Sequence, residues 1–549
     1  MRDWLNSGAP WIWLTGGAVS ISVVMVVGLL WLIAARGLGH FWPQALYQFE
    51  YRNPDGSLET VIGEIHGHEQ VRAAYLLSQE ADAGGDEVGR VLVKTGNRDL
   101  SGHDFRWLDD RRIEGRSSPT GLVAVERREW GNVYGYLLDV REEGRVVAAG
   151  DAVWAALPPR IARVQTLYAR ITTIETQDIG ALNYRLERLR LSERRLDLDH
   201  ALDAAAQRDL HTQRAALDAE LGTLQDKLRE LNAALGRDSL SIGAADGQVV
   251  EIPLSKVVRD YRPNAMGLSA KLGFYFGKLW EFVSAEPREA NTEGGVFPAI
   301  FGTVLMVMLM AVLVTPLGVI AAVYLHEYAK QGALTRLIRI AVNNLAGVPS
   351  IVYGMFGLGF FVYFVGGRLD EWLFPERLPA PTFGSPGLLW SSLTLALLTL
   401  PVVIVATEEG LSRIPSSVRE ASLALGATKA ETLWRTVLPM ATPAIMTGLI
   451  LAVARAAGEV APLMLVGVVK LAPALPLDLN PPYLHLERQF MHLGFHIYDV
   501  GFQSPNIEAA QPLVYATALL LVLVIVVLNL AAIGIRNHLR EKFRALESA

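Results

Sequence analysis

The sequence predicts a mostly α protein in which six transmembrane helices carry an inserted extracytoplasmic α+β domain with a long coiled-coil helix. Three observations support this fold class. Six apolar runs are each long enough to cross a bilayer. Charged residues concentrate between residues 36 and 290, whereas the C-terminal half is rich in Leu, Val and Ala. Within the charged segment, leucines repeat at seven-residue spacing, as they do in coiled coils.

The composition restricts the class of protein further. The chain has 549 residues, a mean hydropathy of +0.27 and 19% charged residues, which is apolar for a soluble protein. The formal net charge of −6 argues weakly against a nucleic-acid partner. The absence of cysteine excludes disulfides, thiolate metal sites and thiol nucleophiles.

The first span is predicted at residues 11–35, an apolar run of about 25 residues. A cleaved signal peptide is the alternative, but the run exceeds a typical signal-peptide core and only Arg2 supplies a basic flank. Three later spans are interrupted by the prolines Pro316, Pro349 and Pro401, which bundles tolerate where neighbours satisfy the freed backbone groups. The other five spans are predicted at residues 297–326, 338–367, 387–407, 440–468 and 512–535.

Basic residues orient these spans. Positive charges follow the second, fourth and sixth spans, which the positive-inside rule places in the cytoplasm. The sequence therefore predicts a multi-pass protein of the cell inner (plasma) membrane with both termini cytoplasmic and residues 36–296 periplasmic or otherwise extracytoplasmic. The basic residues are Lys330, Arg336, Arg339, Arg413, Arg419, Lys429, Arg435, Arg536, Arg540, Lys542 and Arg544.

The predicted domains follow from this topology. Strand-like patterns at residues 45–52, 90–94 and 134–140 and the turn signal Asn53-Pro-Asp-Gly favour a small β-rich domain before the helical segment. The predicted order is an N-terminal cytoplasmic end with the first transmembrane helix (1–35), a β-rich domain (36–160), a coiled-coil segment (161–240), a return segment with an interfacial helix (241–290), the membrane core (291–535) and a basic cytoplasmic tail (536–549).

The heptad pattern runs from Leu182 to Leu231 and is interrupted only at Asp203. If residues 181–236 formed one helix, it would be about 80 Å long at ~1.5 Å per residue. An antiparallel hairpin is the alternative, although no clear turn signal marks it. Two interpretations of the apolar seam stay open: packing on the chain's own β domain, or pairing with a partner's helix, with Asp203 and Arg214 fixing the register.

The loop at residues 411–440, between the fourth and fifth spans, is predicted to form two short helices joined by a tight turn. Gly426 stands where a helix C-terminus adopts positive φ, and Pro439 is expected to end the second helix. Capped helices at the mouth of a membrane domain suit docking of a partner rather than catalysis. Two pairs have the spacing of capping boxes, Ser417 with Glu420 and Thr428 with Glu431.

Arg455 and Glu459 are four residues apart within the predicted fifth span, so they are expected on one helix face. Because an intramembrane charge costs at least ~2.5–3.5 kcal/mol, it is functional by default and faces a polar cavity. A guanidinium in a translocation path favours a tetrahedral oxyanion, and Glu459 would weaken the attraction enough for release. Phosphate, sulfate and molybdate all satisfy this argument. The alternative is a self-neutralising ion pair that only locks helices.

Several motifs resemble one family of membrane permeases. The residues Glu420, Ala421, Gly426 and Leu438-Pro439 have the spacing of the EAA loop of ABC importer permeases, although Ser422 and Thr436 depart from it. Residues 455–462, Arg-Ala-Ala-Gly-Glu-Val-Ala-Pro, resemble the A-type permease subunits of phosphate ABC importers. Four further segments resemble the same subunits in the same order: 294–303, 316–328, 347–354 and 407–411.

The resemblance implies that residues 291–535 form an ABC importer permease core that imports inorganic phosphate. It implies a heterodimer with a second, C-type permease subunit, together with an ATPase dimer and a periplasmic phosphate-binding protein, in contact with membrane lipid. The resemblance does not imply a role for residues 36–290. The implied substrate-path residues are Arg455, Glu459 and, as a path hydroxyl, Ser350; the implied ATPase-coupling residues are Glu420, Ala421, Gly426, Pro439 and, as a loop anchor, Arg413.

The sequence predicts a transporter subunit rather than an enzyme. It contains no P-loop, so a partner must hydrolyse ATP, and no catalytic residue or cofactor is expected. His66 and His68 lack further residues at ligand spacing, so no metal site is expected. The alternatives are a permease for another oxyanion or organic solute, and a membrane-anchored sensor or scaffold that uses the coiled coil.

Overall fold

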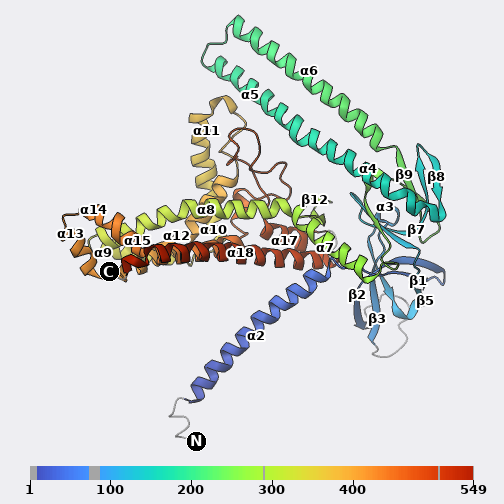
Figure 1. The fold of residues 1–549 in the computed structure, drawn as a ribbon, viewed down its shortest axis with the longest axis horizontal. Helices are drawn as coiled ribbons and strands as arrows, with labels where there is room; N and C mark the ends of the chain where they lie inside the picture. The colour runs from blue at the N-terminus through green and yellow to red at the C-terminus, as the bar shows by residue number, and fades with distance from the viewer. Residues whose placement is uncertain (1–8, 73–86, 289–290, 505–506, 548–549) are drawn as a thin grey trace. The chain divides into compact units, whose positions relative to one another are not determined.

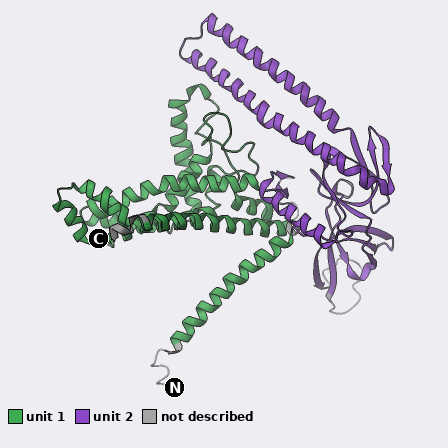
Figure 2. Ribbon diagram, in the orientation of Figure 1, with its two compact units in different colours: residues 1–40, 296–549 green, residues 41–295 purple. Residues whose placement is uncertain are grey.

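The structure is a computed structural model that describes residues 9–72, 87–288, 291–504 and 507–547. The chain divides into two compact units, which Figure 2 shows in different colours. Residues 1–40 and 296–549 form the first, and residues 41–295 form the second. Helices predominate, as predicted (Figure 1). The ends of the predicted terminal segments, 1–8 and 548–549, lie outside the described residues.

The first unit contains the membrane spans. Six helical segments among the described residues are long and apolar enough to cross a membrane, which confirms the predicted number. In chain order they are α2 (Ala9–Gly39); α8 (Phe297–Val323) with the π-helical turn Tyr324–Tyr328; α10 (Ser350–Phe356), a π-helical stretch Gly357–Gly366 and α11 (Gly367–Leu373); α12 (Leu388–Ser412); α14 (Lys429–Thr432), a π-helical turn Leu433–Val437 and α15 (Leu438–Gly458); and α18 (Ile507–Glu547).

Two predicted span boundaries are wrong. Residues 338–345 belong to the separate helix α9 (Ala333–Leu345), and the third span begins only at Ser350, because Pro349 adopts an extended conformation that breaks the helix. The fifth span ends at Gly458 rather than at residue 468. A short helix, α16 (Leu463–Val466), follows Pro462, and α17 (Leu493–Phe502) precedes the last span.

Small residues allow close packing in the core of the first unit. A Cβ atom added to Gly318 on α8 would lie 2.5 Å from the Val403 side chain on α12. One added to Gly448 on α15 would lie 2.6 Å from the Ala406 Cβ, also on α12. Helix α12 therefore lies between α8 and α15, with its side chains in close contact with glycine positions of both helices, as is common among membrane helices.

The second unit contains two large antiparallel sheets and a short two-stranded one, formed by β12 (Pro287–Arg288) and β13 (Glu293–Gly294). Strands β1, β3 and β7 lie where the sequence predicted strands, and Gly56 (φ +86°) donates its N–H to the Asn53 carbonyl at 2.9 Å in the predicted turn. One sheet has the order β4-β3-β2-β1-β5: Phe105–Asp109, Glu87–Lys94, Leu58–Arg72, Leu46–Arg52 and Ile113–Ser117. The other has the order β10-β9-β7-β6-β11, with β8 on β7: Val249–Pro253, Asp238–Gly243, Val133–Glu142, Leu122–Arg127, Val257–Tyr261 and Arg145–Ala149.

The heptad segment forms an antiparallel helical hairpin (Figure 1). Helix α4 (Val153–Thr173) continues through the π-helical turn Ile174–Asp178 into α5 (Ile179–Leu198), and α6 (Ala204–Leu235) returns beside it. The register roles of Asp203 and Arg214 concern pairing with a partner's helix and stay predictions; within the chain the two side chains have other contacts. The Asp203 carboxylate accepts N–H bonds from the first turn of α6, because a short acidic side chain suits an N-cap. The Arg214 side chain is exposed and faces Asp218 at 3.9 Å.

Candidate functional site

The loop between α12 and α15 contains two short helices around a glycine turn. Helix α13 (Ser416–Ala424) is followed by Gly426, whose φ of +89° confirms the predicted left-handed turn. Thr428 and Glu431 form the predicted capping box at the start of α14: the Thr428 N–H donates to the Glu431 carboxylate at 2.8 Å, and the Glu431 N–H donates to the Thr428 hydroxyl at 3.3 Å.

Two other predictions about this loop are wrong. Ser417 does not cap α13, because that helix already begins at Ser416 with Pro415 before it and without a side-chain cap. Pro439 does not end the second helix. It occupies an early position of α15, and the π-helical turn over Leu433–Val437 leads α14 directly into the fifth span.

Contacts to the end of the second span hold the loop in place. The Arg419 guanidinium donates to the carbonyls of Ile414 (2.7 Å) and Leu411 (2.9 Å), and its Nη2 lies 2.9 Å from Oε1 of Glu327. Lys429 bonds to the Glu327 carbonyl and lies over the Tyr328 ring. The sequence marked Arg419 only as one of several basic residues, and it gave no sign of the role of Glu327.

The outer side of the loop is exposed and partly apolar. Glu420 and Ala421 are exposed on α13, as docking requires. Leu425 is 90% exposed and Trp434 is 74% exposed, and neither was identified from the sequence. Arg413, the predicted loop anchor, has a 78% exposed side chain that lies 4.0 Å from the Glu409 carboxylate. In the structure, the anchoring contacts come from Arg419 instead.

Arg455 lies in the last turn of the fifth span. Its Nε is 3.6 Å from Oε1 of Glu459, and both side chains are largely shielded. The prediction that the two share one helix face is wrong, since α15 ends at Gly458 and Glu459 has an extended backbone (φ −80°, ψ +133°). The carboxylate therefore turns back toward the guanidinium from the segment that follows the helix.

The third span packs against this same segment. A Cβ atom added to Gly354 would lie 2.7 Å from the Pro462 Cα, so α10 and the chain after Glu459 meet at backbone distance. The Tyr353 hydroxyl, on the same helix, donates to the Leu345 carbonyl at 2.7 Å. Ser350, partly exposed, is the first residue of α10.

Comparisons with known proteins agree with this architecture. Residues 314–545 match the model of the family described as "Binding-protein-dependent transport system inner membrane component". The chain is 37% identical to "Phosphate transport system permease protein PstA 1" of Mycobacterium tuberculosis (strain ATCC 25618 / H37Rv), over 44% of this chain and 70% of the relative. It is 32% identical to "Phosphate transport system permease protein PstA" of Yersinia pestis, over 46% of this chain and 75% of the relative.

The chain belongs to the PstA permease family. A third relative, "Probable ABC transporter permease protein YqgI" of Bacillus subtilis (strain 168), is 30% identical over 48% of this chain and 86% of its own length. A solved structure of the MetNI methionine ABC transporter aligns with 44% of this chain and 94% of its own at 19% identity, with a TM-score of 0.33. The assignment to the PstA family rests on the sequence relatives alone.

Members of the PstA family are transporter subunits of the membrane rather than enzymes. The family model begins at residue 314, so the second unit lies outside the matched region. The loop, Arg455 and Glu459 all lie inside it.

Proposed function

We propose that the chain is the A-type permease subunit of an ATP-driven importer for inorganic phosphate. The observation that carries this proposal is the similarity, at 32–37% identity, to relatives named as phosphate transport system permease proteins. A shielded guanidinium at the end of the fifth span, Arg455, supports the same conclusion, because an always-charged planar donor suits a tetrahedral oxyanion.

In this proposal, Arg455 attracts the anion along the translocation path. Glu459 competes for the same guanidinium from 3.6 Å, so that the anion binds weakly enough to leave. Ser350 offers a hydroxyl at the start of the third span. The close approach of Gly354 to Pro462 supports this assignment, since it brings the third span to the segment that carries Glu459.

The loop at residues 411–440 acts as the EAA loop and docks on an ATPase dimer. Its exposed residues Glu420, Ala421 and Leu425, and the turn at Gly426, form the docking face. Pro439 joins this face to the fifth span without a break in the helix, and Arg413 lies at its rim. Because the ATPase dimer is a cytoplasmic partner, docking requires the loop to be cytoplasmic. The basic residues that follow the second, fourth and sixth spans agree with this orientation.

The complete importer would contain this chain, a C-type permease subunit as heterodimer partner, the ATPase dimer and a periplasmic phosphate-binding protein. Residues 36–296 would face the periplasm, where the helical hairpin is free to pair with a partner's helix. The chain itself needs no cofactor in this scheme, because the ATPase subunits use the ATP.

Uptake of labelled phosphate by the reconstituted complex tests the proposal. Excess unlabelled phosphate should abolish uptake, whereas equal concentrations of sulfate or molybdate should not. Equal competition by sulfate would reject phosphate specificity in favour of a general oxyanion permease. An assembled complex that transports no anion would favour a sensor or scaffold built on the hairpin.

A further inference from the structure

Helix α7 (Leu268–Ser284) of the second unit exposes its large apolar side chains, whereas charged side chains near its end face the protein. Its large exposed side chains are Leu268, Leu272, Phe276 and Trp280, which recur every four residues and therefore form one stripe. Phe276 is 65% exposed and Trp280 is 70% exposed. None of the exposed positions is charged; they are Leu268, Ser269, Ala270, Leu272, Gly273, Phe276, Gly277, Trp280 and Ser284.

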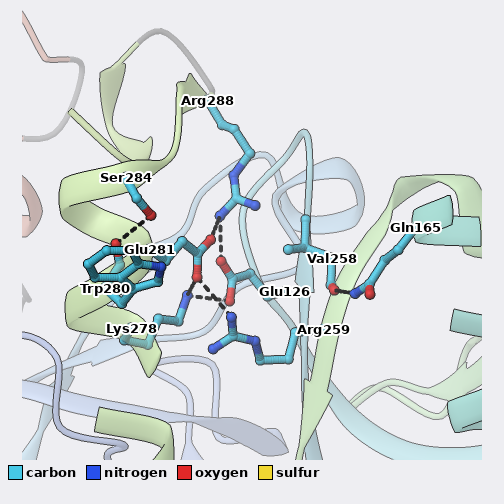
Figure 3. Close-up of polar contacts among 9 residues, drawn as sticks. All are labelled: Glu126, Gln165, Val258, Arg259, Lys278, Trp280, Glu281, Ser284 and Arg288. Atoms are coloured by element: carbon cyan, nitrogen blue, oxygen red, sulfur yellow. Dashed lines mark hydrogen bonds and ion pairs between the residues drawn. The ribbon is translucent and has the colours of Figure 1, made fainter. Parts of the chain in front are cut away.

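The charged residues near the end of α7 turn toward the protein instead. Lys278 bonds to the buried Glu126 of β6, and Glu281 accepts from Arg259 of β11 at 2.9 Å (Figure 3). Arg288, in the short strand β12 (Pro287–Arg288), bonds to both carboxylates, at 2.6 Å to Glu126 and 3.1 Å to Glu281. This ion network fixes the rotation of α7, so the apolar stripe must face outward.

Both chain connections to the membrane spans lie against α7. Phe41 follows the end of α2 by two residues, and its ring centre is 5.1 Å from that of Phe282 and 6.5 Å from that of Tyr275. Trp42 contacts Tyr275 at 6.0 Å.

The second connection lies at the other end of α7. Gly295 precedes the start of α8 by two residues and donates its N–H to the Glu286 carbonyl at 3.1 Å. A Cβ atom on Gly295 would lie 2.3 Å from the Ala285 carbonyl oxygen, so the chain is pressed against the end of α7 immediately before it enters the second span. Residues packed on α7 therefore lie only two residues along the chain from the ends of two membrane spans, at no more than ~3.6 Å of chain per residue.

We propose that α7 lies flat in the bilayer interface, with Leu268, Leu272, Phe276 and Trp280 inserted among the lipids. The combination of a Trp and a Phe with an uncharged apolar stripe is typical of helices that lie in the membrane interface. A protein partner fits less well, since a protein interface of this kind needs about one hydrogen bond per 100–200 Å², and the exposed side chains of α7 offer only two serine hydroxyls and the Trp280 indole N–H. The inference goes beyond phosphate transport: it assigns the second unit a fixed attachment to the lipid surface.

Spin labelling of the full chain in nanodiscs of phosphatidylcholine and phosphatidylglycerol tests the inference. Because the natural chain has no cysteine, Phe276→Cys, Trp280→Cys and Leu272→Cys each give one labelling site without other changes. Val249→Cys, on an exposed position of β10, is the matched aqueous control. We expect labels at 272, 276 and 280 to collide more with oxygen than with a nickel chelate, and the label at 249 to show the reverse.

Two outcomes would overturn the inference. Labels on α7 that are as accessible to nickel as the label at 249 would place the stripe in water. Labels that become shielded from both reagents only after the C-type permease is added would assign the stripe to a protein partner. The use of three positions keeps the test decisive if one variant fails to fold.

Discussion

Arg419 and Glu327 form an ion pair, with 2.9 Å between Nη2 and Oε1, that ties the loop after the fourth span to the end of the second span. Both side chains are largely shielded, and the same guanidinium also bonds to two carbonyls at the end of α12. One arginine therefore joins three segments of the membrane unit. A force applied to the loop reaches the second and fourth spans through these contacts.

Removal of this anchor should disconnect the loop from the spans. We expect Arg419→Ala to lower phosphate uptake about ten-fold or more, because it removes the guanidinium from the shielded Glu327 carboxylate and leaves that carboxylate with the His326 ring nitrogen at 3.1 Å, a loss of about 3 kcal/mol in comparable pairs. Reconstituted uptake and copurification of the ATPase are the measurements. Arg368→Ala, which removes the exposed pair with Glu371, is the control and should transport normally. Wild-type uptake by Arg419→Ala would disprove the role of the anchor.

The second prediction concerns charge substitutions on the docking face of the loop. Leu425→Asp should weaken association with the ATPase about ten-fold, because an exposed apolar side chain at the centre of an interface contributes strongly. Glu420→Lys should uncouple transport for the same reason, while both variants insert into the membrane normally. Leu479→Asp, at an equally exposed leucine outside the loop, is the control. Normal copurification and phosphate-stimulated ATPase activity in both loop variants would contradict the docking role.

Arg455 carries the prediction about the substrate path. Arg455→Ala should abolish uptake with assembly preserved, and Arg455→Lys should restore only part of it, because lysine keeps the charge but loses the fork of donors. Glu459→Gln should slow release of the anion, so that uptake saturates at lower phosphate concentration. Initial uptake rates across phosphate concentrations measure both effects. If Arg455→Ala retains uptake, the pair with Glu459 serves only to lock helices.

The ion network of the second unit predicts a pH effect. Burial alone would raise the pKa of Glu126, but Lys278 and Arg288 outweigh it and hold this pKa below the ordinary value of 4.5. The network therefore stabilises the unit fully above that pH, and this stabilisation is lost as the pH falls through the lowered pKa. Hydrogen exchange of β6, β11 and α7 in the full chain should increase at that point.

Glu126→Gln should reproduce the same loosening at neutral pH. It leaves the shielded cations with one carboxylate fewer, at a cost of about 3 kcal/mol. Glu59→Gln, which breaks a more exposed pair with Arg106, should change stability by less than about 1 kcal/mol. Equal exchange rates in the two variants would show that the network does not hold α7 in place.

Local signals predicted those features that depend on neighbouring residues. The span number followed from apolar length, and the Thr428–Glu431 box and the Gly426 turn followed from spacing of a few residues. The hairpin turn at residues 199–203 was not marked, because it contains neither glycine nor proline; His200 adopts the positive φ of +54° there. Ser417 has the spacing of a cap, but the helix start was set by Pro415 instead.

Features that depend on distant residues escaped the sequence. The carboxylate of Glu126 meets cations 152 and 162 residues away, and Glu327 meets Arg419 across 92 residues. Nothing in the pattern of either segment indicates its partner. The turn of Glu459 back toward Arg455 also depends on the end of α15, which the charge spacing alone did not define.

The helical hairpin starts and ends beside the same strand of the six-stranded sheet. Strand β8, just before α4, and strand β9, just after α6, both pair with β7. Among the described residues, almost all of α4, from Val153 to Ile171, and the last turns of α6, from Leu228, join the core of this sheet. The part of the hairpin beyond these residues is a separable insertion. It can be shortened by whole heptads or exchanged for another hairpin, while the sheet that carries it keeps its strand order.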